Sequence, residues 1–94
     1  MNPFLSDQRW GVDWVRVISN LQASGLSRAA VAERCFVAKG SIDAYGSEDM
    51  RQRPEHSTGE RLIALWCEVL GYERSALPMY RRGVSVSEML RSSR

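Results

Sequence analysis

The chain has 94 residues, a formal net charge of +2, and an ordinary balance of 44% hydrophobic and 26% charged residues. This composition excludes a disordered chain, and the weakly basic charge permits a nucleic-acid partner without requiring one. No apolar run reaches membrane-spanning length, and the N-terminus lacks the pattern of a secretory signal. We therefore expect a cytoplasmic protein with no membrane partner, folded as one domain over residues 1–94. Its compact core would cover about 6–72, followed by a C-terminal extension at 73–94 with a short helix.

The residues that an enzyme or a metal site requires are missing from the sequence. The single histidine, His56, stands beside Glu55, and it cannot form a zinc site with Cys35 and Cys67, which are far apart. Both cysteines fall in apolar helical patterns, so we expect free buried thiols rather than a disulfide. No Cys-x-x-Cys, phosphate-binding glycine loop or nucleophile–base pair appears. The sequence predicts no enzyme, and it predicts no catalytic residue, metal, cofactor or small-molecule ligand.

The first expected helix is amphipathic and ends near Ser24, before Gly25. Its start is either at Ser6 or Asp7, which are good N-caps, or later at Asp13. One buried face is predicted by the i, i+4, i+7, i+8, i+11 spacing of Trp10, Trp14, Val17, Ile18 and Leu21. We expect the two tryptophans to belong to the core, with a binding surface as the alternative.

Two short helices joined by a tight corner are predicted within residues 26–46, one at 28–35 and one at 39–46. Ser27 is a good N-cap for the first of them. Helices this short need packing to be stable. The apolar residues that would pack them together are Val31, Ala32 and Cys35 on the first helix and Ile42 and Tyr45 on the second.

This spacing resembles the helix-turn-helix of the lambda-repressor-like (Cro-type) family, which is often found in phage regulators. The matching positions are Val31 and Ala32 before the turn, Val37 after it, and Ile42 and Tyr45 on the second helix. Residues 54–66 look like the segment that follows the motif in phage-type members, so the resemblance extends over about 13–71. The family implies that the helix at 39–46 enters the major groove of DNA.

Three positions depart from the family pattern. Phe36 stands at a turn position that usually holds glycine, where a left-handed backbone would be strained. Ala38 replaces the usual Ser or Thr cap, and Asp43 brings a negative charge close to phosphates. An ordinary helix pair in a small all-α domain is therefore the alternative interpretation.

The resemblance also implies which residues contact DNA. Arg28 would contact phosphate, Lys39 a guanine edge, and Asp43 a cytosine amino group. Apart from the resemblance, the arginines of a loop at 47–56 would add contacts to the phosphate backbone. The five arginines from Arg74 onward form a basic C-terminal tail that either reaches along that backbone or is simply a solvated end of the chain. The full expected set of DNA-binding residues is Arg28, Lys39, Gly40, Ser41, Asp43, Ala44, Ser47, Arg51 and Arg53.

The last core helix begins at Ser57 or Thr58 and ends at Gly71. Its apolar surface is wider than a core of this size needs, which suggests a second use at a dimer contact. A short helix from Ser85 to about residue 91 would join that contact. The expected dimer-interface residues are Ile63, Trp66, Leu70, Val86, Met89 and Leu90, while Leu62, Leu65 and Val69 face the core. The alternative is that Trp66 completes the core against Trp10 or Trp14.

Together these features predict an all-α fold, a small bundle of four to five helices containing a helix-turn-helix. The expected function is a homodimeric, sequence-specific double-stranded-DNA-binding protein that regulates transcription, of phage or prophage origin. Two alternatives remain open from the sequence. One is a protein-interaction module on the same scaffold that does not bind DNA, and the other is an antitoxin-like subunit.

Overall fold

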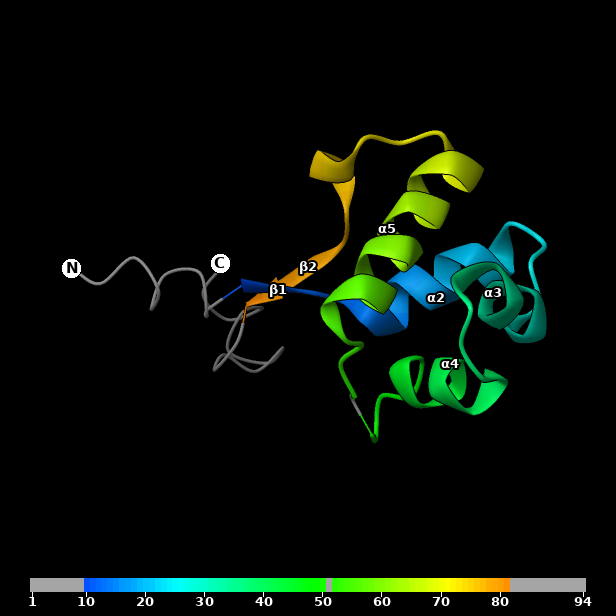
Figure 1. The fold of residues 1–94 in the computed structure, drawn as a ribbon. Helices are drawn as coiled ribbons and strands as arrows, with labels where there is room; N and C mark the ends of the chain where they lie inside the picture. The colour runs from blue at the N-terminus through cyan, green and yellow to red at the C-terminus, as the bar shows by residue number, and fades with distance from the viewer. Residues whose placement is uncertain (1–9, 51, 82–94) are drawn as a thin grey trace.

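The protein is described by a computed structural model that covers residues 10–50 and 52–81 (Figure 1). Within those ranges the elements are β1 (Trp10–Val12), α2 (Trp14–Ala23), α3 (Arg28–Cys35), α4 (Lys39–Tyr45), α5 (His56–Leu70), the 3-10 helix η1 (Arg74–Ala76) and β2 (Met79–Arg81). The described residues form a small globule of four α-helices whose sheet has only two short strands. The expected all-α bundle is confirmed. The helix expected from Ser85 onward, with Val86, Met89 and Leu90, lies outside the described residues.

Helix α2 begins at the later of the two expected starts. The Asp13 side chain accepts a hydrogen bond from the Arg16 amide at 3.2 Å, which is the geometry of an N-cap. Residues Trp10–Val12 form a strand, so a continuous helix from Ser6 or Asp7 is wrong. Trp10 therefore does not extend the buried stripe of α2.

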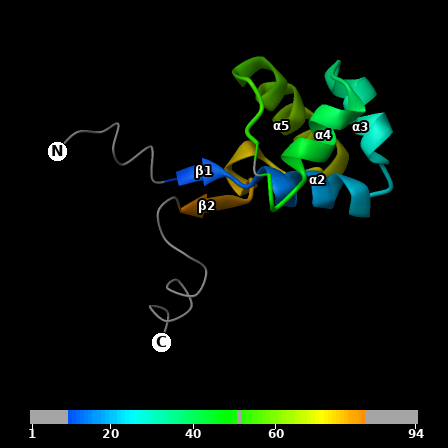
Figure 2. The ribbon, with the colours of Figure 1, turned by 90° about the horizontal axis from the view of Figure 1, so that it is seen from below.

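The N-terminal strand is explained by a partner far along the chain. β1 pairs antiparallel with β2, and Gly11 lies opposite Tyr80 (Figure 2). The Asp13 amide continues the pairing by donating to the Pro78 carbonyl oxygen at 2.9 Å. Because the backbone N–H and C=O groups of this segment are hydrogen-bonded across the two-stranded sheet, helix formation offers them no advantage. Pro78 thus directly precedes β2 and continues its pairing with the N-terminal strand.

The core lies where α2, α3, α4 and α5 pack together, and the segment before β2 covers part of it. The clustered buried residues are Val17, Ile18, Leu21, Val31, Ala32, Cys35, Ile42, Leu62, Ile63, Leu65, Trp66 and Leu77. Trp14, Tyr45, Val69 and Leu70 are partly buried against this cluster. The apolar stripes expected on α2, α3 and α4 are therefore confirmed, apart from Trp10.

Helices α3 and α4 are joined by the expected tight corner. The Ser27 hydroxyl caps α3 by accepting from the Ala30 amide at 3.1 Å. Phe36 ends α3 in the left-handed region, at φ 59° and ψ 42°, a conformation that helix ends more often reach with glycine. Ala38 occupies the N-cap position of α4 but supplies no side-chain hydrogen bond. Helix α4 therefore begins without the side-chain cap that stabilises most helix starts.

Helix α5 begins at His56 and ends at Leu70, and it is followed by the C-cap residue Gly71, whose φ of 73° is left-handed. The structure corrects two of the three α5 residues expected at a dimer contact. Trp66 is 2% exposed and Ile63 is 6% exposed within the single chain, so neither is available as an exposed anchor. The Tyr72 ring lies 5.5 Å from the Trp66 ring and covers it after the helix ends. Only Leu70 of the three α5 residues retains an intermediate exposure.

Candidate nucleic-acid interface

Helix α4 is held to the core by one side and leaves the other side open. Ile42 is fully buried and Tyr45 is half-buried, three residues apart on the inner face. Lys39 and Gly40 are exposed and Ser41 has intermediate exposure. The first turn of α4 thus presents its side chains and backbone to solvent, where another molecule can reach them.

Two of the residues expected to touch DNA have other roles in the structure. Ala44 is 7% exposed, so its methyl group is buried, and the expectation that Ala44 contacts DNA is corrected. The chain turns back directly after α4, with the Ser47 amide donating to the Ala44 carbonyl oxygen at 3.3 Å. The Ser47 hydroxyl then accepts from the Met50 amide at 3.3 Å, so this side chain is used to shape the turn.

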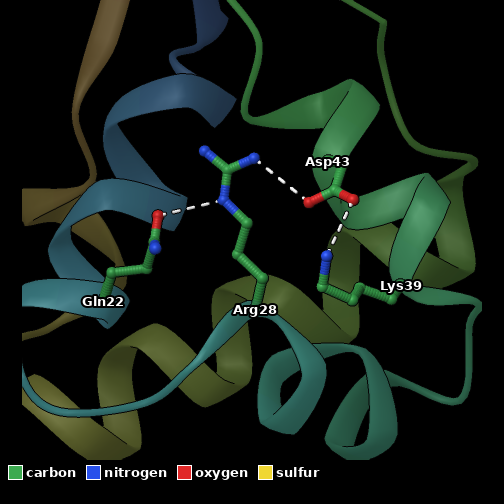
Figure 3. A network of polar contacts seen from close by, with 4 residues as sticks. All are labelled: Gln22, Arg28, Lys39 and Asp43. Atoms are coloured by element: carbon green, nitrogen blue, oxygen red, sulfur yellow. Dashed lines mark hydrogen bonds and ion pairs between the residues drawn. The ribbon is translucent and has the colours of Figure 1, made fainter.

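A polar network joins α2, α3 and α4 at the open side of α4 (Figure 3). Arg28 donates from Nη1 to one carboxylate oxygen of Asp43 at 3.2 Å, and Lys39 Nζ donates to the other at 3.2 Å. The Arg28 Nε also donates to Gln22 Oε1 at 3.1 Å. The hydrogen bonds from Lys39 and then Arg28 hold the pKa of Asp43 below its usual range. Asp43 is therefore an ionised carboxylate shared by two cations.

The backbone leaves room for this arrangement. A Cβ atom at Gly46 would lie 3.2 Å from Arg28 Nη2 and 3.2 Å from the Ile18 side chain. Glycine at this position therefore lets the guanidinium pass over the end of α4 and reach Asp43. The helical pattern around Gln22 does not indicate that its side chain joins this network.

The structure describes some of the other arginines expected to contact DNA. Arg53 is exposed and helps to line a cavity of about 80 Å³ together with Tyr45, which brings it to the end of α4. Arg51 lies outside the described residues. Arg74 pairs with Glu60 at 2.7 Å, and Figure 1 shows η1 and α4 on opposite sides of the molecule. Arg28, Lys39, Ser41 and Arg53 are thus the expected side chains that the structure places on or beside one open surface.

Phe36, whose backbone is left-handed, also has an exposed side chain. The Phe36 side chain is 80% exposed, and the Arg61 guanidinium lies 5.5 Å from the centre of its ring. Arg61 also donates to the Cys35 carbonyl oxygen at 3.5 Å. The corner between α3 and α4 therefore presents an aromatic ring with a cation stacked on it.

The described residues give no group of three or more His, Cys, Asp or Glu side chains that is suited to hold a metal ion. Cys35 and Cys67 are free thiols, and burial raises the pKa of the Cys35 thiol. The described helices include none that is long and apolar enough to span a bilayer.

Comparisons with protein-family models, with curated proteins and with solved structures found no match for this chain.

Proposed function

We propose that this chain is a sequence-specific double-stranded-DNA-binding protein that regulates transcription and inserts α4 into the major groove. The observation that carries the proposal is the open face of α4, where Lys39 is 60% exposed at the side chain and lies next to Arg28 through their common partner Asp43. Gly40 adds a point of close approach, because a Cβ atom there would meet nothing within 4 Å. The resemblance to phage regulators of the Cro type supports the same interpretation.

The short length of α4 supports a homodimer. Seven residues span about 10 Å at 1.5 Å per residue, which matches only about three base pairs. Two copies on half-sites one helical turn apart would double the sequence that is read. We propose that Leu70, with Val86, Met89 and Leu90 from the C-terminal extension, contributes to this contact. The burial of Ile63 and Trp66 removes those two residues from it.

The experiment selects duplexes from a random pool and then measures affinity by fluorescence anisotropy at several salt concentrations. Lys39→Ala is expected to weaken binding to the selected duplex by about 1–3 kcal/mol; an equal loss on random duplex would show that Lys39 contacts a phosphate, and a smaller loss there would show that it reads a base edge. Arg74→Ala is the matched control, because it also removes a cation from an ion pair but lies away from α4. Sedimentation of the complex is expected to give two chains per duplex.

Three results would contradict this proposal in whole or in part. A pool from which no sequence is enriched, together with no binding at low salt, would exclude DNA as the partner. Equal effects of Lys39→Ala and Arg74→Ala would mean that Lys39 contributes only to overall charge. One chain per duplex on every tight site would exclude the dimer.

A protein-interaction module is the second candidate, and the exposure of Phe36 favours it. An aromatic ring that is 80% exposed resembles the anchors of protein interfaces more than a contact to phosphate. The same pool selection separates the two functions, because a module of this kind enriches no duplex.

A further inference from the structure

We infer that Asp43 occupies the position of a DNA phosphate between Arg28 and Lys39, and that DNA must displace this carboxylate to bind. The inference rests on the proposed function and adds to it a built-in control of affinity. It assigns Asp43 the role of an internal competitor, in place of the base-reading role that the family resemblance suggested.

The first support is the geometry of the two cations. Arg28 opens α3 and Lys39 opens α4, yet their side chains converge on the same carboxylate and each contacts a different oxygen (Figure 3). Two donors aimed at two oxygens of one planar anion form an arrangement that also fits two oxygens of a phosphate group. The structure therefore contains a preformed oxyanion position, and Asp43 fills it.

The second support is that the position is accessible and its contacts are loose. The side chains of Arg28, Asp43 and Lys39 are 31%, 41% and 60% exposed, so a phosphate can approach without unfolding the helix pair. Both contacts are 3.2 Å long, whereas charge-assisted contacts of this kind are commonly about 2.7–2.9 Å. Exposed ion pairs of this type contribute little to stability, so an incoming anion can replace them.

The third support is the charge balance. The two cations carry a combined charge of +2, and Asp43 neutralises half of it at the point where α4 would meet the phosphate backbone. The Gln22 amide holds Arg28 through Nε, so the guanidinium stays in place when its Nη1 contact is exchanged. A phosphate that replaces the carboxylate would therefore meet cations that are already oriented.

The test compares three variants on a random duplex of 20 base pairs across a range of potassium chloride concentrations. Asp43→Asn keeps the shape of the side chain and removes its charge, and Asp43→Ala removes both. Glu60→Gln is the matched control, because Glu60 is also an exposed carboxylate paired with an arginine, but it lies on α5. Thermal unfolding by circular dichroism is recorded for each variant, so that a loss of fold is recognised.

We expect Asp43→Asn and Asp43→Ala to bind random duplex about tenfold more tightly at 0.1 M salt, and the slope of log K against log salt to steepen by about one unit. Glu60→Gln changes the net charge by the same amount, and we expect it to change affinity by less than about twofold. Asp43 variants that match Glu60→Gln, or that bind more weakly than the parent while folded, would overturn the inference.

A second readout does not depend on DNA binding. Sodium sulfate is titrated into the Asp43→Ala variant while the Arg28 Nε–H signal is followed by nuclear magnetic resonance. We expect a saturable shift in this variant and a much weaker response in the parent chain, because Asp43 occupies the position there. If no variant binds DNA but the sulfate response appears, the proposed function fails and the oxyanion position stands. If the variant gives no sulfate response, the inference fails whatever the protein does with DNA.

Discussion

The backbone at Phe36 gives a prediction whose size follows from its dihedral angles. Phe36 adopts φ 59° and ψ 42°, a left-handed conformation that costs a residue with a side chain about 1–2 kcal/mol. Glycine avoids this cost but loses about 0.4–1 kcal/mol through its freedom in the unfolded chain. We therefore expect Phe36→Gly to be more stable than Phe36→Ala by about 0.5–1 kcal/mol.

The comparison of two variants removes the contribution of the ring. Both substitutions delete the contact with Arg61, which lies 5.5 Å from the ring centre and contributes about 0.5–1 kcal/mol at an exposed site. Phe36→Gly should therefore be close to the parent in stability, because relief of strain offsets the lost contact. Phe36→Ala keeps the strain and loses the contact, so it should be the least stable of the three.

Chemical unfolding in urea, followed by tryptophan fluorescence and circular dichroism, measures these differences. Gly71→Ala is the control, because Gly71 also has a positive φ, 73°, and a Cβ atom there would meet nothing within 4 Å. It should lose about the same free energy as separates the two variants at position 36. Equal stabilities for Phe36→Gly and Phe36→Ala would refute a left-handed corner at this residue.

Two further predictions concern α4 and the core. Gly40→Ala should stabilise the fold by up to about 1 kcal/mol, because alanine is the better helix former and a Cβ atom there meets nothing. The same variant should weaken binding to a selected duplex, because the added methyl group keeps the backbone of α4 away from the bases. Unfolding and anisotropy on the same samples measure both effects, and a variant that binds at least as tightly would show that α4 does not approach DNA at this point. Trp66→Ala should destabilise the single chain by about 3–5 kcal/mol and reduce its helicity, because Trp66 is 2% exposed. Normal helicity together with a lost dimer would instead place Trp66 at an interface.

Local patterns were sufficient to predict α2, α3 and α4 because each carries its own start signal or apolar spacing. Asp13 and Ser27 cap the helices that follow them, and the apolar residues repeat with the helical period. These features depend on residues within a few positions of one another. The left-handed backbone at Phe36 did not follow from these patterns, because Phe36 was treated as a departure at a position that usually holds glycine.

Features that depend on distant residues were missed. β1 was mistaken for the start of a helix because its partner, β2, comes from the far end of the described chain. Trp66 was assigned to a dimer contact because nothing in α5 reveals that Tyr72 and the following segment return to cover it. The pairing of Arg28 with Asp43 spans fifteen positions and exists only because the corner brings α3 against α4. The apolar or charged character of these residues was evident, but their partners were not.

Residues that locally disfavour the fold are concentrated at the corner and in the first half of α4. Phe36 is strained, Ala38 provides no side-chain cap, and Gly40 weakens the first turn of α4. These three choices together cost about 3–4 kcal/mol, which is large beside a typical total stability of about 5–15 kcal/mol. Asp13 and Ser27 cap α2 and α3, whereas α5, like α4, has no side-chain cap at its N-cap residue, so what sets the corner apart among the described residues is the left-handed backbone of Phe36. Locally unfavourable residues in otherwise consistent sequences are commonly found at functional sites. The same segment carries the exposed ring of Phe36, the open site at Gly40 and the shared carboxylate of Asp43. This combination favours a binding surface, whose residues serve contact with a partner rather than the stability of the fold.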